Sequence, residues 1–278
     1  MDIKRVTSSL LISQDNKTQN RLKKVFTQLA TGKRINSASD DAATLSIITG
    51  LEKQVRGFKT VENNIGDALN ALNISDGAAS SISNMLQRQR ELAVQAANAT
   101  LNSEDRDILN REFQALAQEI DRVANTANFN GQTLLNGSSP LSDGTGTVQV
   151  DPSSDPANQI TVSETDLTAE SLEIENLDIS NGSNSSQAIT ALDNAAKQVN
   201  AARSSQGAIA NRLQHAHNSA VVNRQNTTHA LSRAEDLDFA KAVSDQVRET
   251  LLAQTKIETQ KSFFNIARNS LIALIQQK

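Results

Sequence analysis

A heptad-like apolar stripe through residues 42–98 constrains the fold of this chain more than any other feature of its sequence. Apolar residues recur at alternating steps of three and four, and polar residues stand at three of the expected positions. The apolar members are Ile48, Leu51, Val55, Phe58, Ile65, Leu69, Leu72, Ala79 and Leu86, and the polar ones are Glu62, Asp76 and Ser83. This spacing predicts a helix with coiled-coil-like packing. An unbroken helix over residues 41–98 would be roughly 85 Å long at 1.5 Å per residue, too long for an ordinary globular domain.

The composition favours narrow helix seams over a thick layered core. Aromatic residues make up only 3% of the chain, and Trp and Tyr are absent. A compact core usually draws on large apolar and aromatic side chains, whereas a seam of Leu, Ile, Val and Ala needs much less apolar volume. We therefore expect a mainly α fold.

Further helical stripes lie on both sides of this segment. They are Leu22, Val25, Phe26 and Leu29; Leu109, Phe113, Leu116, Ile120 and Val123; Ile189, Leu192, Ala196, Val199 and Ala202; and Phe239, Val243, Val247 and Leu251. Asn102 or Ser103 can cap the second of these helices, with Glu104 and Asp105 placing negative charge in its first turn. The simplest fold joins the N- and C-terminal segments as long antiparallel helices.

The middle of the chain, residues 138–185, has a different character. It holds all three prolines and is rich in Gly, Ser, Asp and Thr. Residues 146–150 and 159–163 alternate apolar and polar side chains around a turn-rich stretch, which predicts a β-hairpin. Residues 170–180 are expected to form a weaker strand or extended segment.

Composition and charge exclude several kinds of function. The net charge of −4 gives no general basic field, so we expect no nucleic-acid partner. The absence of Cys excludes disulfides, thiolate catalysis and Cys-ligated zinc. No apolar run approaches the length of a membrane span. Gln14 and Asp15 interrupt the short N-terminal apolar patch, and we expect no cleavable secretory signal.

No arrangement typical of an active site is present in the sequence. His215 and His217 would point about 200° apart on a helix and could not share a metal there, and His229 stands alone. There is no HExxH motif, phosphate-binding loop or G-x-S-x-G elbow. We expect a protein that is not an enzyme and that binds no metal or cofactor.

The stretch TGKRINSASDDAAT, residues 31–44, concentrates charge between two predicted helices. Gly32 can adopt the left-handed conformation that closes a helix, and Lys33 and Arg34 follow where the helix's negative end favours cations. The expected start signals of the next helix are a cap from Ser37 or Ser39 and negative charge from Asp40 and Asp41 in its first turn. These charges are typical of helix ends rather than of a catalytic site.

The stretch RQRELAVQAAN, residues 88–98, is a candidate interaction surface. Arg88, Leu92 and Gln95 fall on one helical face, where Leu92 would be an apolar residue among polar ones. The pattern alone leaves open whether this face contacts another protein or is an ordinary packed face with solvated flanks.

Several of these stretches, in this order and spacing, resemble bacterial flagellin over residues 1–137 and 186–278. The matching motifs are LATGKRINSASDDAATLSI, RQRELAVQAANATLNSEDRDIL, EIDRVANTANFNGQTLLNG, ARSSQGAIANRL and SRAEDLDFAKAVS. The resemblance implies a structural subunit that polymerises into the flagellar filament used for swimming. The rivals are the hook–filament junction protein, a flagellin carrying a metalloprotease in its insert, and a cytoplasmic coiled-coil signalling protein. The missing HExxH and the short insert disfavour the second.

The same resemblance implies a division of the chain. Residues 1–41 and 236–278 would form a terminal helical inner-core domain, a paired coiled coil. Residues 42–137 and 186–235 would form a helical shell, and residues 138–185 a short insert without a substantial outer domain. The charged loop would be the spoke between the inner core and the shell, with Arg34, Asn36, Asp40 and Asp41 making contacts within or between subunits.

The resemblance also implies partners and a location. The chain would leave the cell unfolded through the flagellar type III export apparatus, with its C-terminal segment bound beforehand by a chaperone. In the extracellular flagellum it would meet copies of itself and the hook-associated and cap proteins. The positions that match contacts of the vertebrate toll-like flagellin receptor are Arg88, Leu92 and Glu112, with Gln95 on the same face.

Overall fold

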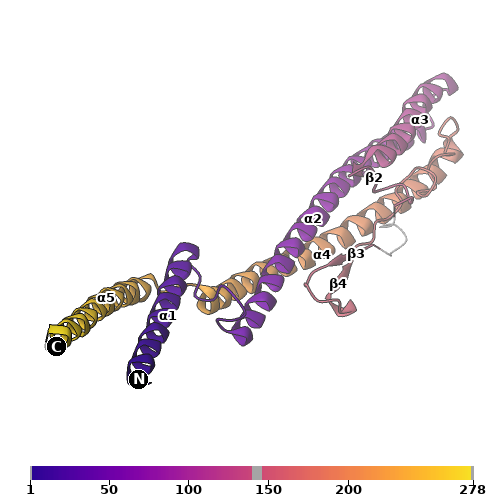
Figure 1. The fold of residues 1–278 in the computed structure, drawn as a ribbon. Coiled ribbons are helices and arrows are strands. Elements are labelled where there is room, and N and C mark those ends of the chain that lie inside the picture. The colour runs from indigo at the N-terminus through magenta and orange to yellow at the C-terminus, as the bar shows by residue number, and fades with distance from the viewer. Residues whose placement is uncertain (1, 140–145, 277–278) are drawn as a thin grey trace. The chain divides into compact units, whose positions relative to one another are not determined.

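The computed structural model describes residues 2–139 and 146–276, and five long helices account for most of them (Figure 1). The helices are α1 (Asp2–Thr31), α2 (Ala42–Ala96), α3 (Ser103–Thr126), α4 (Gly182–Glu235) and α5 (Phe239–Gln276). The short elements are β1 (Asn128–Phe129), β2 (Gln132–Thr133), β3 (Thr147–Gln149), the 3-10 helix η1 (Pro156–Asn158) and β4 (Gln159–Thr161). The predicted mainly α fold is confirmed. Among the described residues, none of the helices combines the length and apolar character needed to cross a bilayer.

The chain forms two compact units, residues 1–53 with 226–278 and residues 54–225. The unit boundaries lie inside α2 and α4, whereas the domain boundaries predicted at residues 41 and 236 coincide with the breaks between helices. In the first unit α1 packs against α5. Lys256 Nζ donates to the Gln14 carbonyl at 3.3 Å, and Arg21 lies 3.7 Å from Glu249. Because the partners' numbers fall along α5 as they rise along α1, the two helices are antiparallel.

In the second unit the predicted heptad positions of α2 are buried or half-buried. Ile65, Leu72, Ala79 and Leu86 are each at most 2% exposed. They pack with apolar residues of α4, including Leu192, Val199, Ile209 and Leu213, in two clusters along the helices. The apolar stripe of α2 therefore forms the contact with α4.

Charged pairs set the register of this seam. Glu62, which is buried, pairs with Arg224 at 2.5 Å, and Asp76 pairs with Arg203 at 2.8 Å. Partner numbers fall along α4 as they rise along α2, which makes the helices antiparallel. A buried charge that loses its partner costs several kcal/mol, on the order of 3–5. A shift of register would therefore be strongly unfavourable at Glu62.

Helix α3 folds back onto α2 after a capped start. The Asn102 side chain accepts from the Asp105 amide at 2.8 Å, which confirms the predicted N-cap. Gln89 Nε2 donates to the Phe113 carbonyl at 3.0 Å, and Phe113 is fully buried. The helix leads into the β1–β2 hairpin, in which Asn130 and Gly131 have φ of +51° and +79°. A two-residue type I′ turn requires this left-handed pair.

The predicted hairpin of the middle segment is confirmed, and the second predicted strand is not. Strands β3 and β4 pair antiparallel, with Val148 opposite Ile160. No strand forms over residues 170–180: residues 170–173 and 175–176 form turns, because the chain reverses at Glu173, where φ is +57°, and residues 177–179 have no regular structure. The Ile174 amide donates back to the Ala169 carbonyl at 2.9 Å. The alternating apolar residues, Leu172 and Ile174, enter the core from this turn rather than from a strand.

A glycine lets the hairpin approach α2 closely. A Cβ atom added at Gly57 would lie 2.6 Å from Cβ of Pro152, in the loop between β3 and β4. Real Cβ atoms do not approach this closely, and the proline ring is rigid. By contrast, a Cβ atom at Gly66 of the same helix would meet nothing within 4 Å.

These two glycines give a matched pair of substitutions. Gly66→Ala is expected to raise the free energy of unfolding by about 0.5–1 kcal/mol, because alanine is the better helix former. Gly57→Ala should lose that gain and weaken the protection of the hairpin amides, since Pro152 must move. Urea unfolding and hydrogen exchange measure the two effects. Equal stabilisation by both substitutions would contradict the packing of Pro152 on α2.

Candidate functional site

The loop between α1 and α2 begins with a left-handed glycine. Gly32 has φ of +71°, and its amide donates to the Gln28 carbonyl at 2.8 Å. This is the helix closure that the sequence predicts. The loop lies within the first unit.

The start of this loop pairs with the segment that follows α4. The Arg34 amide donates to the Glu235 carbonyl at 2.7 Å, and the Leu237 amide donates to the Gly32 carbonyl at 2.9 Å. The Arg34 guanidinium donates to the Ala234 carbonyl at 2.7 Å. Lys33 forms an ion pair with Glu235, which raises the pKa of Lys33. Lys33 and Arg34, the two cations predicted at the end of α1, therefore bind the end of α4. The last carbonyls of a helix attract positive charge.

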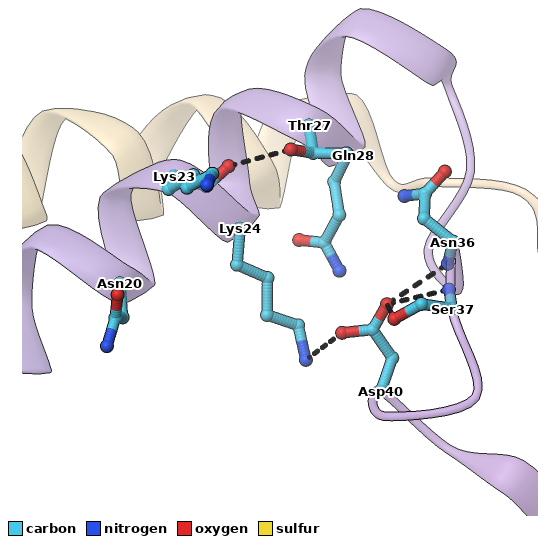
Figure 2. Close-up of a pocket in the computed structure, with 8 residues that line it drawn as sticks. All are labelled: Asn20, Lys23, Lys24, Thr27, Gln28, Asn36, Ser37 and Asp40. Atoms are coloured by element: carbon cyan, nitrogen blue, oxygen red, sulfur yellow. Dashed lines mark hydrogen bonds and ion pairs between the residues drawn. The ribbon is translucent and has the colours of Figure 1, made fainter.

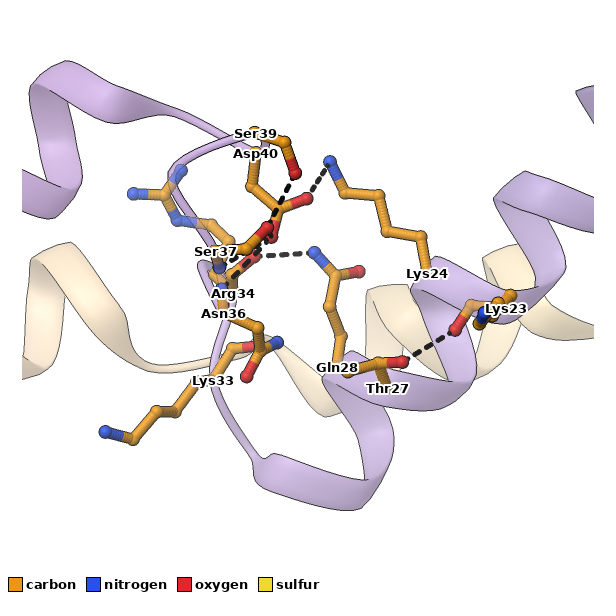
Figure 3. A network of polar contacts seen from close by, with 10 residues as sticks. All are labelled: Lys23, Lys24, Thr27, Gln28, Lys33, Arg34, Asn36, Ser37, Ser39 and Asp40. Carbon is orange, nitrogen blue, oxygen red and sulfur yellow. Dashed lines mark hydrogen bonds and ion pairs between the residues drawn. The ribbon is translucent and has the colours of Figure 1, made fainter.

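Asp40 organises the middle of the loop (Figures 2 and 3). Its Oδ2 accepts from the amides of Asn36 and Ser37, both at 3.1 Å. Its Oδ1 lies 3.0 Å from Lys24 Nζ of α1. The Lys24 contact, followed by the Asn36 amide, lowers the pKa of Asp40. Asp40 was predicted in the first turn of α2, and this is wrong: it fixes the loop to α1.

Asp41 caps α2, in place of the predicted Ser37 or Ser39. Its Oδ1 accepts from the amides of Ala43 and Thr44 at 3.1 and 3.0 Å. Hydrogen bonds from Thr44, its side chain foremost, lower the pKa of Asp41. The two serine hydroxyls lie 2.7 Å from each other, before the helix begins. Aspartate is among the strongest N-cap residues, so a cap at residue 41 satisfies the first amides of α2 directly.

A shallow polar cavity of about 360 Å³ adjoins this loop (Figure 2). It is lined by Asn20, Lys23, Lys24, Thr27, Gln28, Asn36, Ser37 and Asp40. Its carboxylate is already paired with Lys24, and Gln28 donates to the Arg34 carbonyl at 2.6 Å (Figure 3). Sequence reasoning missed these partners and Glu235. The mixed charge of residues 229–240, which mirrors that of the loop, was the available signal.

The predicted interaction face of α2 is partly exposed. Arg88 pairs with Glu112 of α3 at 2.7 Å and with Glu91 at 3.1 Å, and Gln95 is exposed. Leu92 is only 1% exposed and lies in the core with Phe113. Its predicted place on this surface is wrong, because α3 folds back and covers that side of α2.

The apolar residues predicted to form a stripe on α5 lie in that helix, but they remain exposed. Phe239, Val243, Val247 and Leu251 are about half exposed, between 47% and 57%. Other exposed apolar residues of α5 are Leu252, Ile257, Phe263, Phe264, Ile266 and Ile272. The side chains buried in this unit include Thr18, Ala242, Glu249 and Ala253. An apolar surface of this extent marks an interaction site.

The three histidines all lie on α4. His215 and His229 are exposed, and His217 is half-buried. Within residues 2–139 and 146–276 no group of three acidic or histidine side chains could hold a metal ion.

Comparison with known proteins decides the family. The model of the bacterial flagellin N-terminal helical region matches residues 5–140, and that of the C-terminal helical region matches residues 189–274. The chain belongs to the bacterial flagellin family. It is 35% identical to flagellin of Halalkalibacterium halodurans over 235 residues, 84% of this chain and 85% of that one. It is 30% identical to flagellin of Bacillus subtilis over 276 residues, 89% and 90% of the two chains.

Solved structures agree with this assignment. The crystal structure of Bacillus cereus flagellin matches with 35% identity and a TM-score of 0.50, over 57% of this chain and 88% of that one. A putative flagellar hook-associated protein from Vibrio parahaemolyticus matches with a TM-score of 0.57, over 71% and 100% of the two chains. Its identity of 17% shows a shared fold alone. This flagellin is a structural subunit of the flagellar filament, and the hook–filament junction alternative is not favoured.

The lowered pKa values of Asp40 and Asp41 predict that the loop between α1 and α2 is less stable at acid pH. Their pKa values are lowered in the fold, so their stabilising contribution is present above the ordinary pKa of 3.8. It is lost as the pH falls through the lower folded value. Exchange protection of the Asn36 and Ser37 amides should therefore decrease below about pH 3.8, as the acceptor Asp40 becomes protonated.

The Asp105 amide is the internal control, because its acceptor, Asn102, does not titrate. Asp40→Asn should reduce protection of Asn36 and Ser37 at neutral pH as well. If the protection of these two amides followed that of Asp105 at every pH, Asp40 would not be the group that orders the loop.

Proposed function

We propose that this flagellin polymerises through the apolar side chains that α5 leaves uncovered. A half-exposed valine or leucine gains roughly 25 cal/mol for each Å² that a neighbouring copy covers. Together with the six other exposed apolar residues of α5, the four residues of the stripe make ten such side chains among the described residues, so covering them would release a large free energy. Head-to-tail contacts that do not close a ring produce an open helical polymer.

The proposed domain roles follow from this surface. Residues 1–41 and 236–278 form the inner core of the filament, and residues 42–137 and 186–235 form the shell around it. Residues 138–185 are a short insert rather than a separate outer domain. The loop with Arg34, Asn36, Asp40 and Asp41 is the spoke between core and shell. Support comes from three of these residues: Arg34 bonds to the end of α4, Asp40 pairs with Lys24 of α1, and Asp41 caps α2. Asn36 bonds to Lys33 and Asp40 within the loop.

The proposed setting is the extracellular flagellum, in which the protein acts without catalysis. The chain leaves the cell unfolded through the flagellar export apparatus, and a dedicated chaperone binds its C-terminal segment beforehand. Hook-associated and cap proteins contact the ends of the filament. The apolar surface of α5 supports this sequence of events, because it needs shielding before assembly.

The exposed face with Arg88, Gln95 and Glu112 is the proposed contact of the vertebrate toll-like flagellin receptor. Arg88 and Glu112 are about half exposed and offer a fixed cation and anion side by side. Leu92 lies beneath them and supports the face instead of touching a partner.

Substitutions at one position of α5 test the assembly surface. Val247→Asp should raise the critical concentration for polymerisation by about tenfold or more, since it replaces the roughly 0.8–1.5 kcal/mol gained by covering the exposed half of the valine with the cost of covering a carboxylate. Val247→Ile keeps the apolar surface and should still assemble. Sedimentation and electron microscopy measure filament formation, and circular dichroism checks the helix content of the monomers. Normal assembly of Val247→Asp would exclude this surface.

A second pair of substitutions tests the receptor face. Arg88→Ala and Glu112→Ala are expected to reduce activation of receptor-bearing cells by about tenfold, the loss of one good interface contact. Arg90 forms an equally exposed pair with Asp193 of α4 and serves as the control. Arg90→Ala should retain the full response. Wild-type activation by Arg88→Ala would place the receptor contact elsewhere.

A further inference from the structure

A carboxylic acid is buried where the insert crosses the α2–α4 seam. Glu164, three residues after β4, is only 4% exposed. Its Oε2 accepts from Ser75 Oγ of α2 at 2.8 Å and from Gln206 Nε2 of α4 at 2.6 Å. Gln206 Nε2 also lies 2.7 Å from Ser75 Oγ. One side chain of the insert therefore joins both long helices.

No cation neutralises this group among the charged residues that adjoin it. On α2, Asp76 follows Ser75, and on α4, Arg203 lies one turn before Gln206. These two charges pair with each other at 2.8 Å. On the insert, Asp166 accepts from the Thr168 amide at 2.9 Å. The apolar neighbours on the same insert segment, Ile160 and Val162, are buried as well, and burial raises the pKa of Glu164.

Two buried acceptor atoms of this network lack a hydrogen-bond donor. Glu164 Oε1 and Gln206 Oε1 are both buried and have no hydrogen-bond partner. Both atoms can only accept when Glu164 is ionised. Protonation of Glu164 at Oε1 turns one of the two acceptors into a donor and removes an unpaired buried charge. The neutral acid is thus the form that suits these surroundings.

We propose that Glu164 is a proton-operated latch, which holds the insert on α2 and α4 when it is protonated and releases the insert when it ionises. Below the unfolded pKa the latch contributes its full stability. As the pH rises through the higher folded pKa, that stability is lost. The direction is opposite to that of Asp40 and Asp41 in the first unit.

Hydrogen exchange against pH tests the latch. The reporters are two amides of the insert: Val162, which donates to Gly146 at 2.8 Å, and Leu167, which donates to Leu135 at 2.9 Å. Their protection, corrected for intrinsic exchange rates, should fall by up to about tenfold for each pH unit between the pKa of the released carboxyl and the higher pKa of the buried one, and should level off above the latter. Glu164→Gln imitates the neutral acid and should give a flat profile. Glu170→Gln, which alters an exposed carboxylate of the same insert, should behave as the wild type.

A third variant keeps the acid but changes its surroundings. The Ser75 hydrogen bond lowers the pKa of Glu164, so Ser75→Ala should move the fall in protection to higher pH. A wild-type profile as flat as that of Glu164→Gln would overturn the latch. So would a fall that persists in Glu164→Gln. If Glu164→Gln is unprotected at all pH values, the Ser75→Ala profile decides: an unmoved midpoint overturns the proposal.

Discussion

The antiparallel seam between α2 and α4 is the constraint on which the second unit depends. A chain with 3% aromatic residues has only a narrow apolar stripe to bury, so the charged residues in that stripe need partners across it. The ion pairs along these helices differ in how much they contribute to the free energy of unfolding. Losing Arg224 would leave the buried Glu62 carboxylate with Lys59 of its own helix, 3.8 Å away, and would cost up to about 3–5 kcal/mol, whereas exposed pairs such as Arg90–Asp193 contribute little. The register is therefore fixed by a few partly buried charges, and α3 and the insert pack against the helices that this register aligns.

In the first unit polar side chains are buried and large apolar side chains are exposed. Along α1 and α5 the buried residues include Thr18 and Glu249, whereas the large apolar side chains of α5 lie half exposed. Glu249 has one oxygen 3.7 Å from Arg21 and a second, buried oxygen without a hydrogen-bond partner. Such a pair of helices gains little free energy from its own contact, which accords with a surface completed by neighbouring copies.

The spacing of apolar residues predicted the long helices and the β3–β4 hairpin. The helical period of about 3.6 residues and the strand period of two are both visible within a short stretch of sequence. Sequence reasoning predicted Ser37 or Ser39 as the cap of α2 instead of Asp41, since serine and aspartate are both favoured cap residues and spacing does not fix the residue at which the helix begins. It misplaced Leu92, whose burial depends on α3, and it took the alternation of residues 170–180 for a strand although a turn at Glu173 produces it. The burial of Glu164 had a signal that went unused: it continues the inward phase of Ile160 and Val162.

The pairing of Gly32 and Arg34 with Glu235 and Leu237 joins residues about two hundred positions apart. Contacts of such long sequence separation form slowly, because a large loop must close before they contribute. Local helices need only neighbouring residues and do not depend on these distant contacts. The junction, in contrast, must wait until almost the whole polypeptide is present. The contact between the two segments is thus expected to form late in folding.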